Sequence, residues 1–173
     1  MKRLRRTVMN VACAVLGTVT MAQEVVRPSR PTAAQLPRAN HLGERVTGIR
    51  LSTTSVIELP GGETVLLYGY IVGKPNGDSN YFLWNDALDL ACYGKTERQA
   101  DGSGLGDLNC DRGDTQVLTG PFLVVAEKYG RLRATVSAVL ATSDGRPYRA
   151  VLRWHGRDAF PDPEPLLAAF GRS

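Results

Sequence analysis

Short runs of apolar residues alternate with turn-forming residues from about Val46 to His155, and no long stretch repeats its apolar residues at a helical period. The β-prone runs fall at residues 55–59, 63–73, 81–84, 87–95, 122–127, 131–141 and 148–155. Glycine, proline, asparagine and aspartate separate them, as in antiparallel sheets. The run at 63–73 is apolar at almost every position, which predicts a central strand covered on both faces. The pattern predicts an all-β domain at 46–157, a small antiparallel barrel or sandwich of about eight strands.

The runs at 131–141 and 148–155 show the clearest alternation and predict a hairpin. Their inward faces carry Leu132, Ala134, Val136, Ala138 and Leu140 in the first run and Tyr148, Ala150, Leu152 and Trp154 in the second. These faces must meet across the pair. Opposing Leu140 with Tyr148 leaves a three-residue loop at 143–145. Gly145 then takes the third loop position, where a positive φ completes a type I turn with a G1 bulge.

The stretch ADGSGLGDLNCDRGD at 100–114 is interpreted as part of a second hairpin, whose loop is again located at the midpoint between two opposed residues. If Cys92 and Cys110 face each other across an antiparallel pair, the loop is 100–102, with Gly102 again in third place. Opposed residues in such a pair lie about 4.5 to 5.5 Å apart, within the Cα separation that a disulfide accepts. Cys13 lies in an N-terminal stretch that is expected to be cleaved on export, which leaves Cys92 and Cys110 as an even pair. A Cys92–Cys110 disulfide is therefore predicted, and it should stabilise the fold by about 3 kcal/mol.

The first 22 residues have the layout of a secretory signal peptide. Four lysines and arginines precede an apolar stretch that ends in small residues, so cleavage is expected before Gln23. A membrane anchor is the alternative, but the apolar stretch is shorter than the roughly 18 to 20 residues that span a bilayer. The mature protein is expected in the periplasm or outside the cell, where disulfides persist, with no membrane span after cleavage.

Removal of this leader balances the charge. The full chain has 21 Lys and Arg against 17 Asp and Glu, and the leader holds four of the basic residues and no acidic one, which leaves 17 of each. Overall basicity then gives no argument for nucleic-acid binding, and none is expected. Residues 23–45 contain three prolines and predict a flexible tether. Residues 158–173 form a tail in which PLLAAF predicts a short helix.

Two apparent binding motifs in the glycine-rich stretch lack required residues. Asp107, Asn109 and Asp111 match the first three ligands of a calcium loop, but Arg112 and Leu118 stand where it needs glycine and glutamate. In the predicted hairpin these three side chains line the solvent face. The nearby glycines lack the spacing of a dinucleotide fingerprint. The cysteines and the two histidines match no common zinc spacing. No metal or cofactor is expected.

One outward surface concentrates cationic side chains. In the predicted register its members are Arg131, Arg133, Arg149, Arg153 and His155, with Arg157 just beyond. Like charges opposed across a ladder are unfavourable unless an anion or an acidic neighbour compensates. The planar fork of arginine suits carboxylates and phosphates, so this arginine face is the candidate binding surface for an acidic protein or another polyanion of the envelope. A solvated edge that blocks pairing with other chains is the alternative.

These observations favour an exported, non-catalytic binding or accessory domain whose partner the sequence does not name. No serine stands in a nucleophile elbow and the domain has a single histidine, so no catalytic residue is predicted. A periplasmic hydrolase and a structural envelope protein are the alternatives. A deep polar pocket would favour the enzyme, and an exposed apolar or arginine-lined patch would favour the binding protein.

Overall fold

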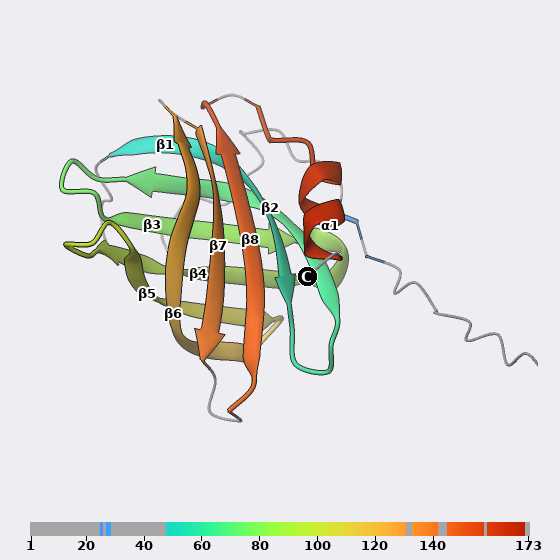
Figure 1. The fold of residues 1–173 in the computed structure, drawn as a ribbon. Helices are drawn as coiled ribbons and strands as arrows, with labels where there is room; N and C mark the ends of the chain where they lie inside the picture. The colour runs from blue at the N-terminus through green and yellow to red at the C-terminus, as the bar shows by residue number, and fades with distance from the viewer. Residues whose placement is uncertain are drawn as a thin grey trace, which may run out of the picture.

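The computed structural model describes residues 25, 27–28, 48–130, 133–141, 145–157 and 159–171, with the backbone alone described at 125–130 and 133. In this part of the chain eight strands precede one short helix (Figure 1). The strands are β1 (Ile49–Glu58), β2 (Thr64–Gly73), β3 (Ser79–Asn85), β4 (Leu90–Arg98), β5 (Gly104–Arg112), β6 (Thr115–Gly130), β7 (Arg133–Ala141) and β8 (Pro147–His155), and the helix is α1 (Glu164–Phe170). The predicted all-β architecture and its C-terminal helix are confirmed. The predicted signal peptide and almost all of the tether lie outside the described residues.

The sheet closes on itself to form a barrel. Each strand pairs antiparallel with its neighbour in the chain, and β8 pairs with β1. In Figure 1, β6, β7 and β8 cross β2 to β5 at a steep angle. The long strand β6 joins the two groups, because its residues 115–124 pair with β5 and its residues 122–130 pair with β7. The closed strand order decides for a barrel over a sandwich.

Three of the hairpin loops share one hydrogen-bonding pattern. The amide of the first residue donates to the carbonyl four residues later, and a glycine amide donates back to the first carbonyl, at 2.8 to 3.1 Å. The loops run from 59 to 63, 74 to 78 and 99 to 103, and their glycines at 62, 77 and 102 have φ between 84° and 94°. Glycine adopts this φ without strain. The loop predicted at 100–102 is therefore confirmed, and two further loops repeat it.

Both predicted registers are confirmed. Cys92 opposes Cys110 in a disulfide with their Cα atoms 4.0 Å apart, and Leu140 opposes Tyr148. Gly145 has the expected positive φ of 75°. Residues 142–144, which include the rest of that predicted loop, lie outside the described residues.

The strand predicted at 87–95 begins later than its apolar pattern indicates. A single 3₁₀ turn, η2 (Asp86–Leu88), follows β3, and β4 starts at Leu90. The cause is Asn85, whose side-chain oxygen accepts from the Leu88 amide at 3.1 Å while its side-chain nitrogen donates to the Leu66 carbonyl at 3.0 Å. This cap fixes a turn that alternation alone does not reveal.

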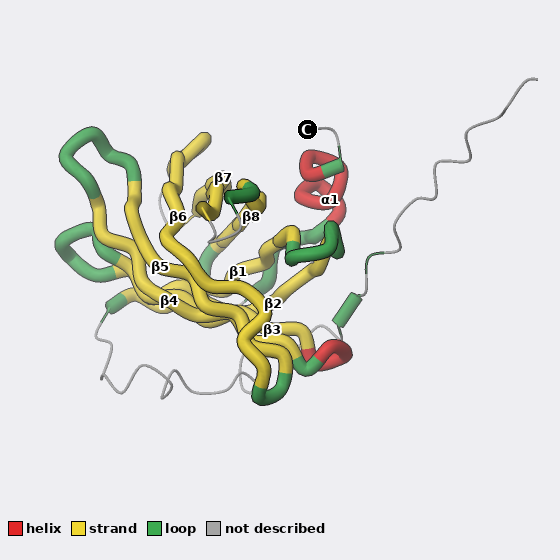
Figure 2. The backbone as a smooth tube through the Cα atoms, turned by 90° about the horizontal axis from the view of Figure 1, so that it is seen from below, coloured by secondary structure: helices red, strands yellow, loops and turns green. Residues whose placement is uncertain are grey.

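An apolar cluster separate from the barrel interior covers part of the outer surface of the barrel. The helix α1 lies against the outer surface near β8 and β1 (Figure 2), where it buries Leu166 and Phe170. Phe160 joins them, with its ring centroid 5.4 Å from that of Tyr68 on β2. The strand β2 is therefore buried on both faces, as its continuous apolar run predicts.

Candidate functional site

One end of the barrel interior is filled. It lies next to the loops that follow β1, β3, β5 and β7, and an Arg112–Glu63 ion pair at 2.8 Å belongs to the same end. Side chains that are at most 5% exposed pack there around the buried Cys92–Cys110 disulfide: Ile57, Leu59, Val65, Leu67, Leu90, Leu118, Leu140 and Tyr148. We call this cluster the plug.

Beyond the plug the interior is hollow and opens at the other end of the barrel. The cavity has a volume of about 690 Å³, which is within the usual range for small-molecule sites. Its wall is mainly apolar and includes Leu51, Ile71, Tyr81, Val124, Val136, Leu152 and Trp154. An eight-stranded barrel is wide enough either to be filled by its own side chains or to hold one small ligand. This barrel is filled by its own side chains at the plug, and beyond the plug it has room for a small ligand.

Glycines on the inward face of β4 and β5 allow two aromatic rings to lie against the wall. Tyr81 opposes Gly94, and Phe122 opposes Gly106. A methyl group at position 94 would overlap both the Tyr81 hydroxyl and the Asp107 carbonyl, and one at position 106 would come within 3.0 Å of the Phe122 ring. The two rings meet edge to face with centroids 5.6 Å apart. Larger residues at positions 94 and 106 would push these rings into the cavity. With glycine at both positions, that space remains open.

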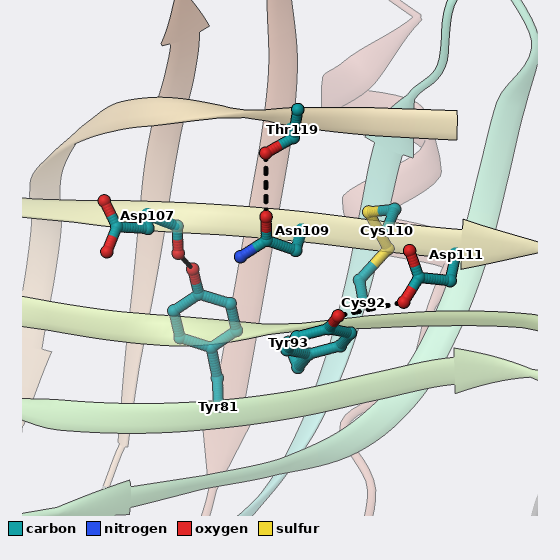
Figure 3. The surroundings of a disulfide bond; sticks show 8 residues. All are labelled: Tyr81, Cys92, Tyr93, Asp107, Asn109, Cys110, Asp111 and Thr119. Atoms are coloured by element: carbon teal, nitrogen blue, oxygen red, sulfur yellow. Dashed lines mark hydrogen bonds between the residues drawn. A yellow bond between two sulfur atoms is a disulfide. The ribbon is translucent and has the colours of Figure 1, made fainter. Parts of the chain in front are cut away.

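The Tyr81 hydroxyl is hydrogen-bonded to the backbone of the cavity wall. It donates a hydrogen bond to the backbone carbonyl of Asp107 across β4 (Figure 3). Burial raises the pKa of the Tyr81 phenol far above its usual value of 10, and the neighbouring Asp107 carboxylate adds to the rise. The phenol therefore stays neutral and anchors the ring.

The opposite wall is shallow because two alanines face each other on β7 and β8. Ala138 and Ala150 are directly opposed in the ladder, and both line the cavity. The Ser55 hydroxyl, also in the wall, donates to the Val151 carbonyl at 3.2 Å. The Tyr81 and Ser55 hydroxyls of the wall are thus both held by backbone carbonyls, and the rest of the inner wall is mainly apolar.

Two of the three hairpin loops with the common hydrogen-bonding pattern, 74–78 and 99–103, form part of the rim of the cavity. Lys74, Asp78 and Arg98 line the open end of the cavity. The Arg98 amide donates to the Asp78 carboxylate at 3.0 Å, which ties the two loops together, and Asn76 donates to the other carboxylate oxygen at 2.6 Å. Charge is therefore concentrated at the mouth while the interior is apolar.

The arginine face is only partly described, and one of its members is engaged by the protein itself. Arg149 forms an ion pair with Glu58 at 3.3 Å and lies over the Phe170 ring at 4.6 Å, so it helps to hold α1. Arg153 is half-buried beside α1, and His155 is exposed opposite Arg133. Arg131 and the side chain of Arg133 lie outside the described residues. Polyanion binding by this face stays a prediction.

The acidic stretch that imitates a calcium loop lies on the outer face of β5. Asn109 accepts from Thr119 at 2.7 Å, and Asp111 accepts from Tyr93 at 2.9 Å (Figure 3). The hydrogen bond to Asp111 raises the pKa of Tyr93, with burial adding to the effect. Within the described residues no group of three His, Cys, Asp or Glu is placed to hold a metal ion.

Sequence reasoning missed the cavity, although part of its signal is visible in the chain. The glycines at 104 and 106 suggest phosphate binding at first. They precede the inward-facing Leu108 on β5 by four and two residues, so they share its face and lie on the inner wall. A series of small inward residues, continued by Gly94, Ala138 and Ala150, indicates a wall that does not fill its barrel.

Among the described residues, no helix has the length and apolar character needed to cross a membrane. No protein-family model, curated protein or solved structure matches the chain. We therefore infer the function from the geometry of the barrel.

Proposed function

We propose that this protein is an exported, non-catalytic binding protein that holds one small, largely apolar molecule inside its barrel. The observation that carries the proposal is the open cavity of about 690 Å³ with an apolar wall above the plug. Binding sites for small molecules are usually concave, mainly apolar and already formed before the ligand arrives. The Cys92–Cys110 disulfide also supports export, because disulfides persist in oxidising compartments.

The driving force is the removal of apolar surface from water. An alkyl ligand gains about 0.8 kcal/mol for each methylene that it buries. The plug closes the far end, so a ligand enters and leaves through the mouth between the loops. The wall hydroxyls of Tyr81 and Ser55 already donate to carbonyls, so an apolar ligand leaves no wall hydroxyl of this pair without a partner.

A filling variant tests this proposal. Ala138→Phe places a ring inside the cavity, whereas the control Val139→Phe adds one at the next residue of β7, which faces outward and is 51% exposed. Binding is measured with N-phenyl-1-naphthylamine, a neutral apolar fluorophore. We expect the native protein and Val139→Phe to bind it alike and Ala138→Phe to bind at least about tenfold more weakly, a difference of roughly 1.4 kcal/mol. Equal binding by all three would place the fluorophore elsewhere and refute the proposal.

Folding is monitored in the same samples. Circular dichroism and the denaturant midpoint show whether Ala138→Phe keeps its barrel, since overpacking typically costs about 1 to 3 kcal/mol. Ala150→Phe fills the same space from β8 and provides a second variant. Loss of binding in a folded variant supports the cavity as the site.

A further inference from the structure

The mouth of the cavity carries two cationic side chains that have no acidic partner among the described residues. Lys74 follows β2 and is half-buried, and Arg98 ends β4. Both line the open end of the cavity. Across the described part of the chain, neither forms an ion pair with a carboxylate. In Figures 1 and 2 the loops after β2 and β4 lie side by side at one end of the barrel.

The loops hold the backbone of both cationic residues in place. The Arg98 amide donates to Asp78, and the Arg98 side chain crosses the next loop at Gly77, where its Cδ lies 2.6 Å from the place a Cβ would take. Gly77 has a φ of 94° and leaves room for this crossing. Lys74 is in the same loop, whose ends are joined by the Lys74 amide and the Asp78 carbonyl at 2.8 Å.

The carboxylate of Asp78 at this rim is already occupied. One oxygen accepts from the Arg98 amide and the other from Asn76, so both carboxylate oxygens are hydrogen-bonded within the two loops while Asp78 keeps its negative charge. Within the described ranges neither the Lys74 ammonium nor the Arg98 guanidinium is ion-paired with a carboxylate, so both can contact a ligand at the mouth. Charge-assisted hydrogen bonds from such groups favour carboxylate and phosphate oxygens.

We propose that the ligand is an anionic amphiphile, with its alkyl tail in the cavity and its carboxylate or phosphate headgroup on Lys74 and Arg98. This inference rests on the proposed function, because the tail needs the cavity. It adds a direction of entry, since the packed plug and the charged mouth allow only a tail-first orientation. It also adds selectivity against neutral and cationic amphiphiles of the same length.

Ligands that share one tail and differ in headgroup test the inference. Dodecanoate, dodecyl phosphate, dodecanol and dodecyltrimethylammonium compete with N-phenyl-1-naphthylamine at pH 8 and low ionic strength, with the ionic ligands below their micelle concentrations and dodecanol below its solubility. We expect both anions to bind about tenfold more tightly than dodecanol, because two partly exposed ion pairs each contribute a few-fold. The cation should bind most weakly, and the preference should shrink as salt is added.

A matched pair of variants assigns the effect to the rim. Lys74→Gln with Arg98→Gln should bring the anions to within about twofold of dodecanol and leave dodecanol unchanged, because the ion pairs are lost and the tail contacts are kept. The control, Lys95→Gln with Arg157→Gln, removes the same charge from exposed residues outside the cavity lining and should keep the preference. Denaturant midpoints verify that both variants fold.

The outcomes separate the two proposals. If dodecanol displaces the fluorophore as well as the anions do, the headgroup inference is wrong and the cavity proposal stands. An anion preference that survives in the rim variant also overturns the inference. If no dodecyl ligand displaces the fluorophore, the cavity proposal fails as well. Comparison of dodecanoate with dodecyl phosphate then tells which headgroup the rim prefers.

Discussion

Replacement of Gly94 by alanine tests how the cavity wall is built. Gly94 lies on β4 beneath the Tyr81 ring, and a Cβ there would overlap the Tyr81 hydroxyl and the Asp107 carbonyl. The ring would have to leave the wall and turn toward the cavity, which breaks its hydrogen bond to Asp107. The substitution should therefore reduce both stability and the volume available to a ligand.

The expected cost is about 2 to 4 kcal/mol. Overpacking of a buried site contributes about 1 to 3 kcal/mol, and loss of one hydrogen bond adds about 1 kcal/mol. In a Tyr81→Leu background the ring and its hydrogen bond are absent, so of the three atoms nearest to a Cβ at position 94 only the Asp107 carbonyl oxygen remains. The cost should then fall by at least about 1 kcal/mol, which is the coupling that a double-mutant cycle measures.

Guanidinium denaturation of the four proteins in this cycle provides the free energies of unfolding, provided that the denaturant dependence stays constant. Gly73→Ala is the matched control, because a Cβ on that β2 glycine meets its nearest atom at 4.0 Å. It should leave stability unchanged or slightly raised. Additive effects of Gly94→Ala and Tyr81→Leu, or a Gly94→Ala protein as stable as the control, would refute the proposed support of the ring by Gly94.

Three further predictions concern the plug, the wall and the outer cover. Reduction of Cys92–Cys110 under denaturing conditions, followed by refolding as the dithiol, should lower the free energy of unfolding by about 3 kcal/mol; equal midpoints for the two forms would contradict this. Because the folded pKa of Tyr81 is raised above 10, its contribution to stability is constant below pH 10 and declines as the pH rises further. Tyr81→Phe should flatten that alkaline decline in pH-dependent denaturation, and an unchanged slope would refute it. Arg149→Ala should cost about 1 kcal/mol, because a partly exposed ion pair and a cation–π contact with Phe170 are lost, and should speed hydrogen exchange in α1; unchanged exchange there would argue against this docking role.

Local sequence signals were sufficient to predict both hairpin registers and the disulfide, and they located most of the strands, although β1 and β6 extend well beyond the predicted runs at 55–59 and 122–127. The alternation on either side of Gly102 and Gly145 fixes which residues oppose each other, because a shift of one residue would turn every side chain to the wrong face. The loop at 100–102 follows from the assumption that Cys92 and Cys110 oppose each other, and the structure confirms this pairing. Local signals also predicted the terminal helix, through the apolar residues that it buries.

The cavity and the outer cover could not be predicted in this way. Alternation assigns Ala138 to the inner face but does not tell whether side chains from the opposite wall fill the space in front of it. That depends on closure of the barrel, which is a property of all eight strands. Likewise, sequence alone indicates a solvent-exposed cation at Arg149, and its partner Glu58 lies 91 residues away. Long-range contacts of this kind leave no local pattern.

The most direct test of the ligand-binding proposal is a chain-length series of neutral alcohols from hexanol to dodecanol. The Trp84→Phe variant removes the tryptophan on the outer surface and leaves Trp154, which lines the cavity, as the reporter. Binding inside the cavity predicts that affinity rises roughly fourfold per methylene until the tail fills the cavity, and that Ala138→Phe moves this plateau to shorter chains. Affinities that do not depend on chain length, or a plateau that Ala138→Phe leaves in place, would contradict it.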